Sequence, residues 1–333
     1  MAREHSTDVA IIGGGIMGAS IAWQVAQRGA GRVTLFERAT IAAGASGKTG
    51  ALLRRHYTNE PEAILAQRSH QVFRDWNAVV GGDCGYVPAG IVITIPTGPG
   101  CERNIELLHR NVALQNRLGI DSRVISAREL RELQPFVQVD DIAAAAYEPT
   151  SGYVDAVAAT RSMALAARRA GALIQEGCRV IRIVTDGARV AGIETDDGLV
   201  PAGTVICAAG PWSTSLLATA GVRVPITALR VQVAIIHRPL DLDEPHFVYI
   251  DAAAGMFCRP WGPGRTLVGV AGGDQHDAVD PDQYDERNDP AYPASAIAAI
   301  SRRMPGMARA ASLHGHAGLY DMTPDAHPII GST

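Results

Sequence analysis

The chain has 333 residues, of which 47% are hydrophobic and 19% charged, with a formal net charge of −4 at pH 7. This length predicts two domains, or one domain with a large insertion, around a sizeable core. The charge argues against a nucleic-acid partner, and no apolar run approaches the roughly 18 residues needed to cross a bilayer. The polar residues 1–7 leave no room for a cleavable signal, so we expect a cytoplasmic protein without a membrane partner.

The cysteines predict neither a disulfide framework nor a zinc site, because they are odd in number, scattered and without CxxC spacing. They are Cys84, Cys101, Cys178, Cys207 and Cys258. We therefore expect no bound metal.

The N-terminal segment has the pattern of a dinucleotide-binding βαβ unit. Residues 9–12 form an apolar run typical of a buried strand, and a helix is expected over residues 16–28. Between them, Gly13, Gly15 and Gly18 permit a tight turn, close approach of a pyrophosphate and packing of helix against strand. The exposed N–H groups at the helix N-terminus favour an anion there.

A carboxylate completes this unit. Residues 33–37 predict the second strand, and Glu37 at its end is placed to accept hydrogen bonds from both hydroxyls of an adenosine ribose. The unit by itself does not distinguish FAD from NAD.

The rest of the chain predicts alternating helices and strands followed by a sheet-rich segment. A loop rich in small residues is expected over residues 42–51, and Ser126 with Glu129 predicts a capping box before a short helix. Further helices are expected over residues 60–80, 101–118 and 155–170, strands over 91–95, 179–184, 189–194 and 204–209, antiparallel strands between 231 and 270, and a polar excursion over 277–293. This order predicts an α/β fold.

Four segments together carry a resemblance to a known family. They read DVAIIGGGIMGASIAWQVAQRG with Glu37, then ASGKTGALLRRHYTNEPEA, TVICAAGPWS and GLYDMTPDAHPIIG. In order and spacing they resemble the D-amino-acid-oxidase-like superfamily of FAD-dependent oxidoreductases, in particular its sarcosine oxidase and dimethylglycine dehydrogenase branch.

The resemblance implies a Rossmann-like FAD domain of the glutathione-reductase type, interleaved with an α+β substrate domain that carries a mixed or antiparallel sheet. The FAD domain is expected over residues 1–85, 150–225 and 315–333. The substrate domain is expected over residues 86–149 and 226–314.

The resemblance also implies which residues contact FAD. The glycine turn is expected to contact the pyrophosphate, Glu37 the ribose and Val180 the adenine. The segment from Tyr320 to Asp325 is expected to contact the isoalloxazine. The expected set is Gly13, Gly15, Ile16, Met17, Gly18, Glu37, Arg38, Ser46, Lys48, Thr49, Gly50, Ala51, Val180, Gly210, Trp212, Tyr320 and Asp325.

For the substrate, the resemblance places Arg54 where a planar guanidinium would bind a carboxylate with two parallel hydrogen bonds. Arg55 is expected at the surface or behind the binding residues. His56 and Tyr57 are expected to shape an amine pocket, although a packing role is equally consistent with the sequence. The implied reaction is hydride transfer from a small secondary or tertiary amine, or an amino acid such as sarcosine, dimethylglycine or proline, to flavin N5.

The chain departs from the family pattern at two functional positions. Gly318 stands where covalent sarcosine oxidases have the cysteine that links the flavin, and residues 44–51 contain no histidine, so we expect noncovalent FAD. Apolar Leu267 and Val268 stand near the position of the lysine that promotes oxygen reduction. The electron acceptor is therefore oxygen or a redox partner, and Lys48, the only lysine of the chain, is a candidate substitute from the opposite loop.

The C-terminal segment raises a further expectation. Residues 328–331 predict a strand leading into more flavin-pocket backbone, so we expect the natural protein to extend beyond Thr333. Two alternatives stay open at this point: a noncatalytic or partner-dependent subunit of an amine dehydrogenase complex, and an NAD-dependent dehydrogenase.

Overall fold

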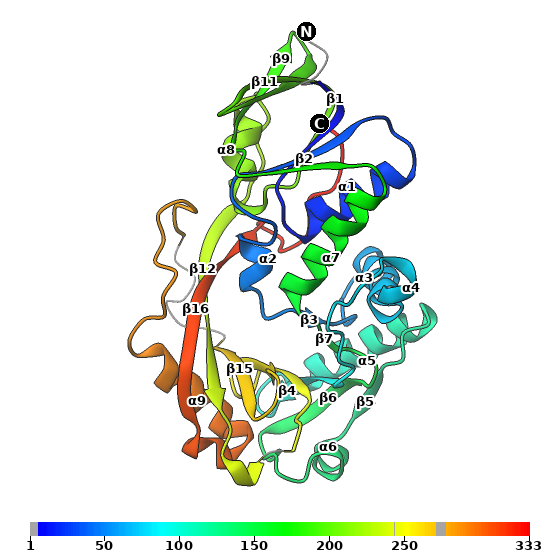
Figure 1. The fold of residues 1–333 in the computed structure, drawn as a ribbon. Helices are drawn as coiled ribbons and strands as arrows, with labels where there is room; N and C mark the ends of the chain where they lie inside the picture. Colours follow the sequence, from blue (N-terminus) through cyan, green and yellow to red (C-terminus); the bar gives the residue numbers. More distant parts are fainter. Residues whose placement is uncertain (1–5, 243, 271–277) are drawn as a thin grey trace.

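The computed structural model describes residues 6–242, 244–270 and 278–333. Asp277, the first residue of the expected polar excursion, lies outside them. The described strands form two large sheets, one around β1 and β2 and the other around β4, β6 and β15 (Figure 1). The fold is therefore a mixed α/β arrangement, as the sequence predicts.

The first sheet has the spatial order β8 (Leu173–Glu176), β2 (Val33–Glu37), β1 (Thr7–Ile12), β11 (Gly198–Cys207), β10 (Arg189–Thr195) and β9 (Val180–Asp186). β1 lies between β2 and β11 and is parallel to both, with Ile12 opposite Phe36 on one side and Cys207 on the other. This register brings the carboxyl ends of the three strands to one edge of the sheet. Ligands bind at this edge in open α/β sheets.

The second sheet has the order β16 (Ala311–Met322), β12 (Thr227–His237), β15 (Arg265–Val270), β14 (Met256–Pro260), β13 (Val248–Asp251), β4 (Ile91–Pro96), β6 (Ile142–Glu148) and β5 (Arg123–Ile125). It is mixed, because β13 and β4 are parallel whereas β12 and β16 are antiparallel. The long strands β12 and β16 extend from this sheet towards the first (Figure 1). They physically connect the two parts of the molecule.

The described helices are α1 (Ile16–Gln27), α2 (Ala45–Lys48), α3 (Glu60–Arg74), α4 (Trp76–Val79), α5 (Cys101–Arg117), α6 (Ala127–Leu133), α7 (Ala156–Arg169), α8 (Ser213–Ala218) and α9 (Tyr292–Arg303). A small sheet pairs β3 (Leu52–Leu53) with β7 (Gly152–Tyr153), and 3-10 turns occupy Gly210–Trp212, Leu240–Leu242 and Pro305–Arg309. Among the described residues, none of the helices combines the length and the hydropathy required to span a membrane.

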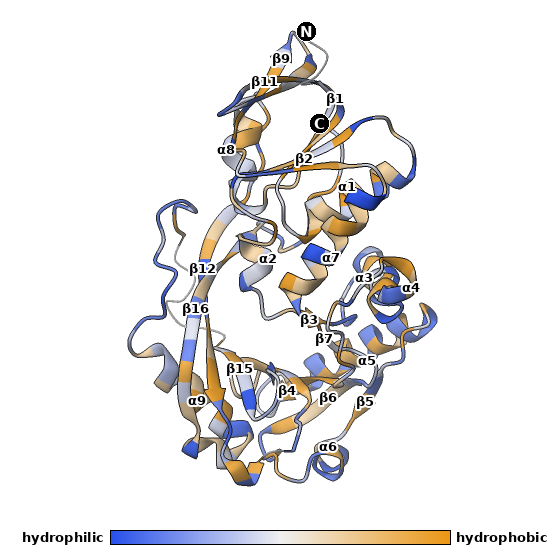
Figure 2. Ribbon diagram, in the orientation of Figure 1, coloured by the Kyte–Doolittle hydropathy of each residue, from blue (hydrophilic) through white to orange (hydrophobic). Residues whose placement is uncertain are grey.

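Small residues allow α1 and α7 to pack closely beside β1. Ala19 and Ala22 of α1 and Ala167 of α7 are buried in one apolar cluster with Ile11 and Leu35. Figure 2 shows apolar segments in strands and helices of both parts of the molecule. This packing fixes the N-terminus of α1 against the edge of the first sheet.

Three local predictions are wrong. The helix expected over residues 60–80 breaks at Asp75, where the chain turns so that Trp76 stacks on Phe73 and donates its indole N–H to Ser162. The loop expected over residues 42–51 contains the helical turn α2. Residues 328–331 form no strand, because the chain turns after Met322 and leaves the sheet.

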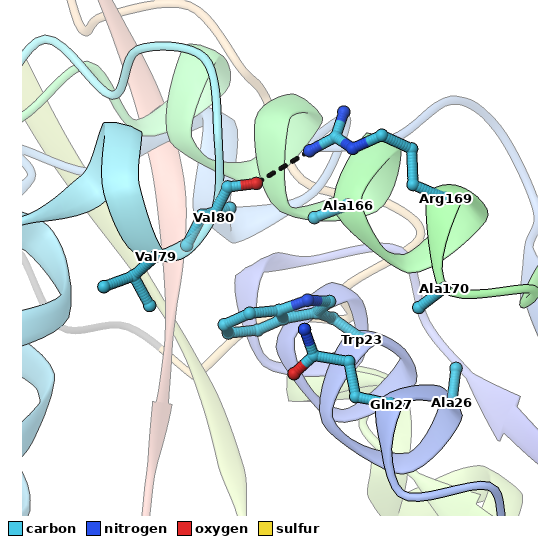
Figure 3. Close-up of a pocket in the computed structure, with 8 residues that line it drawn as sticks. All are labelled: Trp23, Ala26, Gln27, Val79, Val80, Ala166, Arg169 and Ala170. Carbon is cyan, nitrogen blue, oxygen red and sulfur yellow. Dashed lines mark hydrogen bonds between the residues drawn. The ribbon is translucent and has the colours of Figure 1, made fainter.

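A small recess of about 350 Å³ lies where α4 packs against α1 and α7 (Figure 3). Trp23 and Val79 line it, and Arg169 closes one side by donating a 2.7 Å hydrogen bond to the carbonyl of Val80. The recess lies at the carboxyl end of α1, whereas the glycine turn lies at its N-terminus. It is therefore separate from the site described next.

Candidate cofactor and substrate site

A cleft of about 2050 Å³ runs along the carboxyl ends of β1, β2 and β11 and continues between α2 and the long strands β12 and β16. Its walls come from both large sheets. The volume exceeds that of ordinary small-ligand pockets. It suits an extended ligand that spans both parts of the molecule.

The glycine turn forms one wall of the cleft, and steric contacts explain two of its glycines. Gly13 has φ 110°, and a Cβ there would collide with the carbonyl oxygen of Ala208. A Cβ on Gly18 would overlap the carbonyl oxygen of Gly13, so this glycine allows α1 to approach β1. The first N–H of α1, on Ile16, donates a 3.0 Å hydrogen bond to the Ser46 hydroxyl.

Glu37 lies at the end of β2 and faces this turn. Its carboxylate accepts hydrogen bonds of 2.7 Å from the N–H of Gly14 and 2.8 Å from the N–H of Ala39. These bonds fix the position of the carboxylate while it still lines the cleft. A fixed carboxylate beside a helix N-terminus is the arrangement used to bind a nucleoside diphosphate.

Most of the residues expected to contact the cofactor line this one cleft. They are Gly13, Gly15, Ile16, Met17, Glu37, Arg38, Ser46, Lys48, Thr49, Gly50, Val180, Gly210, Trp212 and Tyr320. Three expected residues do not line it. Gly18 packs behind the turn, Ala51 accepts a hydrogen bond from the N–H of Val154, and Asp325 is exposed and bonds Thr323.

The sequence reasoning missed several parts of the wall, among them residues 231–233 of β12 and two further segments. One is the segment that carries Asp282, Tyr284 and Glu286, and the other is the C-terminal stretch 326–331. From its polar composition, the first segment was predicted only to leave the sheet. Nothing in its composition identified which residues of the cofactor wall it would contact.

The expected substrate residues Arg54, His56 and Tyr57 do not line this cleft. The Arg54 guanidinium stacks over the Tyr57 ring at 4.6 Å and donates to the His56 carbonyl at 3.5 Å. Burial raises the pKa of Tyr320, which lines the cleft, and the positive charge of Arg54 opposes that rise. Arg54 therefore lies near enough to act electrostatically on a cleft residue.

His56 is buried and uncharged at neutral pH. Burial, reinforced by the Arg54 charge, lowers the pKa of His56 to about 4. Its Nδ1 atom has no protein partner. A neutral imidazole next to a guanidinium provides polarity without adding a second positive charge.

Arg55 is buried, so a place at the surface is wrong. Its guanidinium binds Ser151 at 3.2 Å, Gln67 at 3.2 Å and the hydroxyl of Thr150, and lies 3.9 Å from the Glu148 carboxylate. Burial lowers the pKa of Arg55 and raises the pKa of Glu148. The two adjacent arginines thus lie in different environments, since Arg55 is buried in the core and Arg54 is only partly buried.

Arg259 is a second buried arginine that the sequence did not indicate. Its guanidinium lies between the rings of Tyr153 and Trp261, 4.5 and 4.4 Å from their centroids, and its Nε donates a 2.6 Å hydrogen bond to the carbonyl of Gly50. Burial lowers the pKa of Arg259 to about 10. This side chain connects β14 to the loop that carries Gly50 at the cleft wall.

The comparisons with known proteins agree with this architecture. The family model described as FAD dependent oxidoreductase, DAO, matches residues 8–333. The glycine turn, the fixed carboxylate and the cleft between two sheets are features of a dinucleotide-binding flavoenzyme. The chain belongs to the DAO family of FAD-dependent oxidoreductases, which answers the question between FAD and NAD that the βαβ unit leaves open.

Individual relatives place the chain within this family. It is 30% identical to mouse sarcosine dehydrogenase over 230 residues, which are 67% of this chain and 25% of that protein. It is 25% identical to glycine oxidase of Geobacillus kaustophilus over 334 residues, which cover 98% of this chain and 84% of that protein. The chain therefore spans about a quarter of the sarcosine dehydrogenase and most of the glycine oxidase.

Solved structures show the same fold. L-proline dehydrogenase from P. horikoshii superposes with a TM-score of 0.88 at 24% identity, covering 99% of this chain and 85% of that one. Glycine oxidase from Bacillus cereus superposes with a TM-score of 0.80 at 26% identity, covering 98% and 86%. Both large sheets are thus part of the shared fold.

Proposed function

We propose that the chain binds FAD noncovalently in the cleft and oxidises the C–N bond of a small secondary or tertiary amine or amino acid, of the sarcosine, dimethylglycine or proline kind. The observation that carries the proposal is a cleft whose wall holds the glycine turn, Glu37 and Tyr320, with Arg54 close enough to Tyr320 to oppose the rise in its pKa. We further propose that the cofactor domain comprises residues 1–85, 150–225 and 315–333, with residues 86–149 and 226–314 forming the substrate domain.

The residues present fit FAD. The glycines of the turn allow α1 to approach the end of β1, so that the N-terminus of α1 faces the cleft as an anion site, and the Glu37 carboxylate is held beside it as a ribose ligand. Gly318 offers no side chain for a thioether, and a Cβ there would come within 3.0 Å of the Cβ of Lys48. Gly318 therefore allows α2 to lie close to β16, and the lack of a side chain at this position is consistent with a noncovalent flavin.

When bound, FAD accepts a hydride equivalent from the substrate carbon. The protein's part is to hold the substrate so that its C–H bond faces the flavin and to keep the amine nitrogen neutral. Arg54 would bind the substrate carboxylate, while the uncharged His56 and the Tyr57 ring would border the amine. Loss of the hydride leaves an iminium on the substrate, which water hydrolyses to the carbonyl compound and the released amine. This sequence requires no strong general base from the chain.

The names of two relatives support the substrate class. Sarcosine dehydrogenase and glycine oxidase are named for amino acids with a small or absent side chain. A further relative, 29% identical over 262 residues, is the 4-methylaminobutanoate oxidase of Paenarthrobacter nicotinovorans, named for an N-methyl amino acid. We therefore place a small N-substituted amino acid first among the candidates.

The direct test is an anaerobic panel of sarcosine, dimethylglycine, proline, glycine and methylamine mixed with the FAD-loaded protein. We expect the flavin absorbance to bleach with at least one N-substituted amino acid and not with methylamine, which has no carboxylate. Bleaching by none of the panel would contradict the proposal. Acid precipitation of the same protein should release the yellow cofactor into the supernatant.

A partner-dependent role is the second candidate. The chain is 25% identical, over 99% of its length, to sarcosine oxidase subunit beta of Arthrobacter sp., a protein named as one subunit of an assembly. If the chain works only in such an assembly, the purified chain should hold FAD but bleach only after its partner is added. A redox partner rather than oxygen would then accept the electrons, in keeping with the apolar, buried Leu267 and Val268.

A further inference from the structure

A polar segment crosses from the second sheet to the cofactor wall. This segment, residues 278–291 and here named the strap, precedes α9 and is the largely hydrophilic coil beside β12 in Figures 1 and 2. Its base is fixed to the long strands, because Gln232 of β12 exchanges two 2.8 Å hydrogen bonds with Asp289 and the N–H of Ala317 donates to the Glu286 carbonyl at 2.8 Å. From this base two side chains reach the opposite wall.

The first contact is made by Asp282. Its carboxylate binds the guanidinium of Arg38 and accepts a 2.9 Å hydrogen bond from the indole N–H of Trp212, and Arg179 lies 3.9 Å away. The Arg38 guanidinium also stacks over the Trp212 ring at 4.1 Å. The hydrogen bond from Arg38 lowers the pKa of Asp282, so this carboxylate is charged.

The second contact is made by Tyr284 and Glu286, a few residues further along the strap. The ammonium group of Lys48 binds the Glu286 carboxylate and donates a 2.9 Å hydrogen bond to the Tyr284 hydroxyl. Burial alone would lower the pKa of Lys48, but the bonds to Glu286 and Tyr284 raise it. Lys48 is therefore positively charged, and its charge is paired with that of Glu286.

These contacts change the expected roles of two cations. Arg38 and Lys48 line the cleft, yet each already faces a carboxylate of the strap. A cation neutralised by a carboxylate has little charge left to bind phosphate or activate oxygen. Arg38 follows the ribose-binding Glu37, and Lys48 lies in the loop assigned to the diphosphate and flavin, so the strap contacts the cofactor wall at two separate points.

We propose that Asp282 and Glu286 are positioning residues that hold the two walls of the cleft together over FAD and so slow its release. The proposal rests on the cofactor position given above and not on the identity of the substrate. Because the paired side chains are 20–61% exposed, each pair should contribute modestly. We expect about a two- to fivefold faster release of FAD on losing either pair.

The experiment measures FAD release directly. FAD-loaded protein is diluted, and the rate at which free flavin fluorescence appears is recorded for the unmodified chain, Asp282→Asn and Glu286→Gln. The matched control is Asp285→Asn, which removes the same charge from the same segment but only a pair with the exposed Arg287. Both test variants should release FAD faster and the control should not, and raising the salt concentration should accelerate release less in each test variant than in the unmodified chain, because one of the two pairs is already lost.

Exchanging the charges of Arg38 and Asp282 distinguishes the effect of their ion pair from direct binding of FAD by Arg38. Arg38→Asp should accelerate release, and the double variant Arg38→Asp with Asp282→Arg should restore most of the slow release if the pair is what matters. If the exchange restores nothing, Arg38 binds FAD directly and the proposal is overturned. Equal acceleration in Asp285→Asn would also overturn it. Since no substrate is present, a chain that retains FAD but oxidises no amine would contradict the proposed function alone.

Discussion

At the scale of single residues, Arg54 and Arg55 differ in how firmly their side chains are held. Arg55 uses its donors on Ser151, Thr150 and Gln67, whereas among the described residues the direct contacts of the Arg54 guanidinium are the Tyr57 ring and one long hydrogen bond. A guanidinium held this loosely keeps its fork available for a carboxylate. The buried side chain of Arg55, by contrast, fixes this segment of the chain through its hydrogen bonds.

Replacing Arg54 with Ala should weaken binding of a carboxylate ligand by about 1.5–3 kcal/mol, the usual contribution of hydrogen bonds to charged groups. The measurement is the dissociation constant of benzoate, followed by the change it causes in the flavin spectrum. Arg54→Lys should recover only part of the affinity, because an ammonium lacks the planar fork. Unchanged benzoate affinity in Arg54→Ala would remove Arg54 from the binding site.

Buried histidines should make the protein sensitive to mild acid. His246 is buried, its ring nitrogens face the Phe247 carbonyl at 2.6 Å and the Thr266 hydroxyl at 2.8 Å, and burial lowers its pKa to about 4. The unfolded chain binds a proton near pH 6.5 and the folded chain does not, so stability is full above that pH and falls as the pH drops towards 4. The loss for this residue amounts to roughly 3 kcal/mol.

Urea unfolding between pH 4.5 and pH 7, followed by circular dichroism, measures this effect. His246→Gln should be less stable at pH 7 but should lose less stability than the unmodified chain as the pH falls. Parallel pH profiles for the two proteins would show that His246 is not responsible. Burial also lowers the pKa of His56 to about 4, so His56 adds to the loss of stability at low pH.

At the scale of elements, contact between the turn and α1 depends on Gly18. Gly18→Ala should destabilise the chain by about 1–3 kcal/mol, because the added methyl group forces α1 away from the Gly13 carbonyl. It should also weaken FAD binding, since the helix N-terminus moves with it. The matched control is Gly203→Ala on β11, where a Cβ would meet no atom closer than 3.4 Å. Similar unfolding free energies for the two variants would contradict this account.

Local signals in the sequence predicted some of these elements well. The capping box of Ser126 and Glu129 is present with both of its hydrogen bonds, because it depends only on residues three apart. Asn59 and Pro61 start α3 for the same local reason. The break at Asp75 was missed, since it depends on Trp76 reaching Ser162, a residue far along the chain.

The same distinction holds for the cofactor wall and the strap. The glycine turn and Glu37 belong to one continuous unit, so their spacing alone predicted that they would meet. The contact of Asp282 with Arg38 joins residues 244 positions apart, and no periodicity or spacing encodes such a pairing. Residues 328–331 were expected to form a strand from their β-branched composition, but no strand edge is paired with them.

At the scale of the whole molecule, one cleft collects segments from almost the full length of the chain. Its wall runs from Gly13 through Val180 and Val231 to Ile330. The long strands β12 and β16 carry the second sheet to this wall, and the strap joins it to the first. A ligand in the cleft therefore contacts both parts of the fold at once.

Hydrogen exchange with and without FAD tests this coupling. At about 100 times its dissociation constant, FAD should stabilise the folded chain by about 2.7 kcal/mol. Because the wall draws on both sheets, exchange should slow together in the glycine turn, in the cleft-facing ends of β12 and β16 and in the strap. Amides on the outer turns of α5, which contributes nothing to the cleft, should change least. Protection confined to β1 and α1 would mean that the dinucleotide binds only the first sheet, and that β12, β16 and the strap do not enclose it.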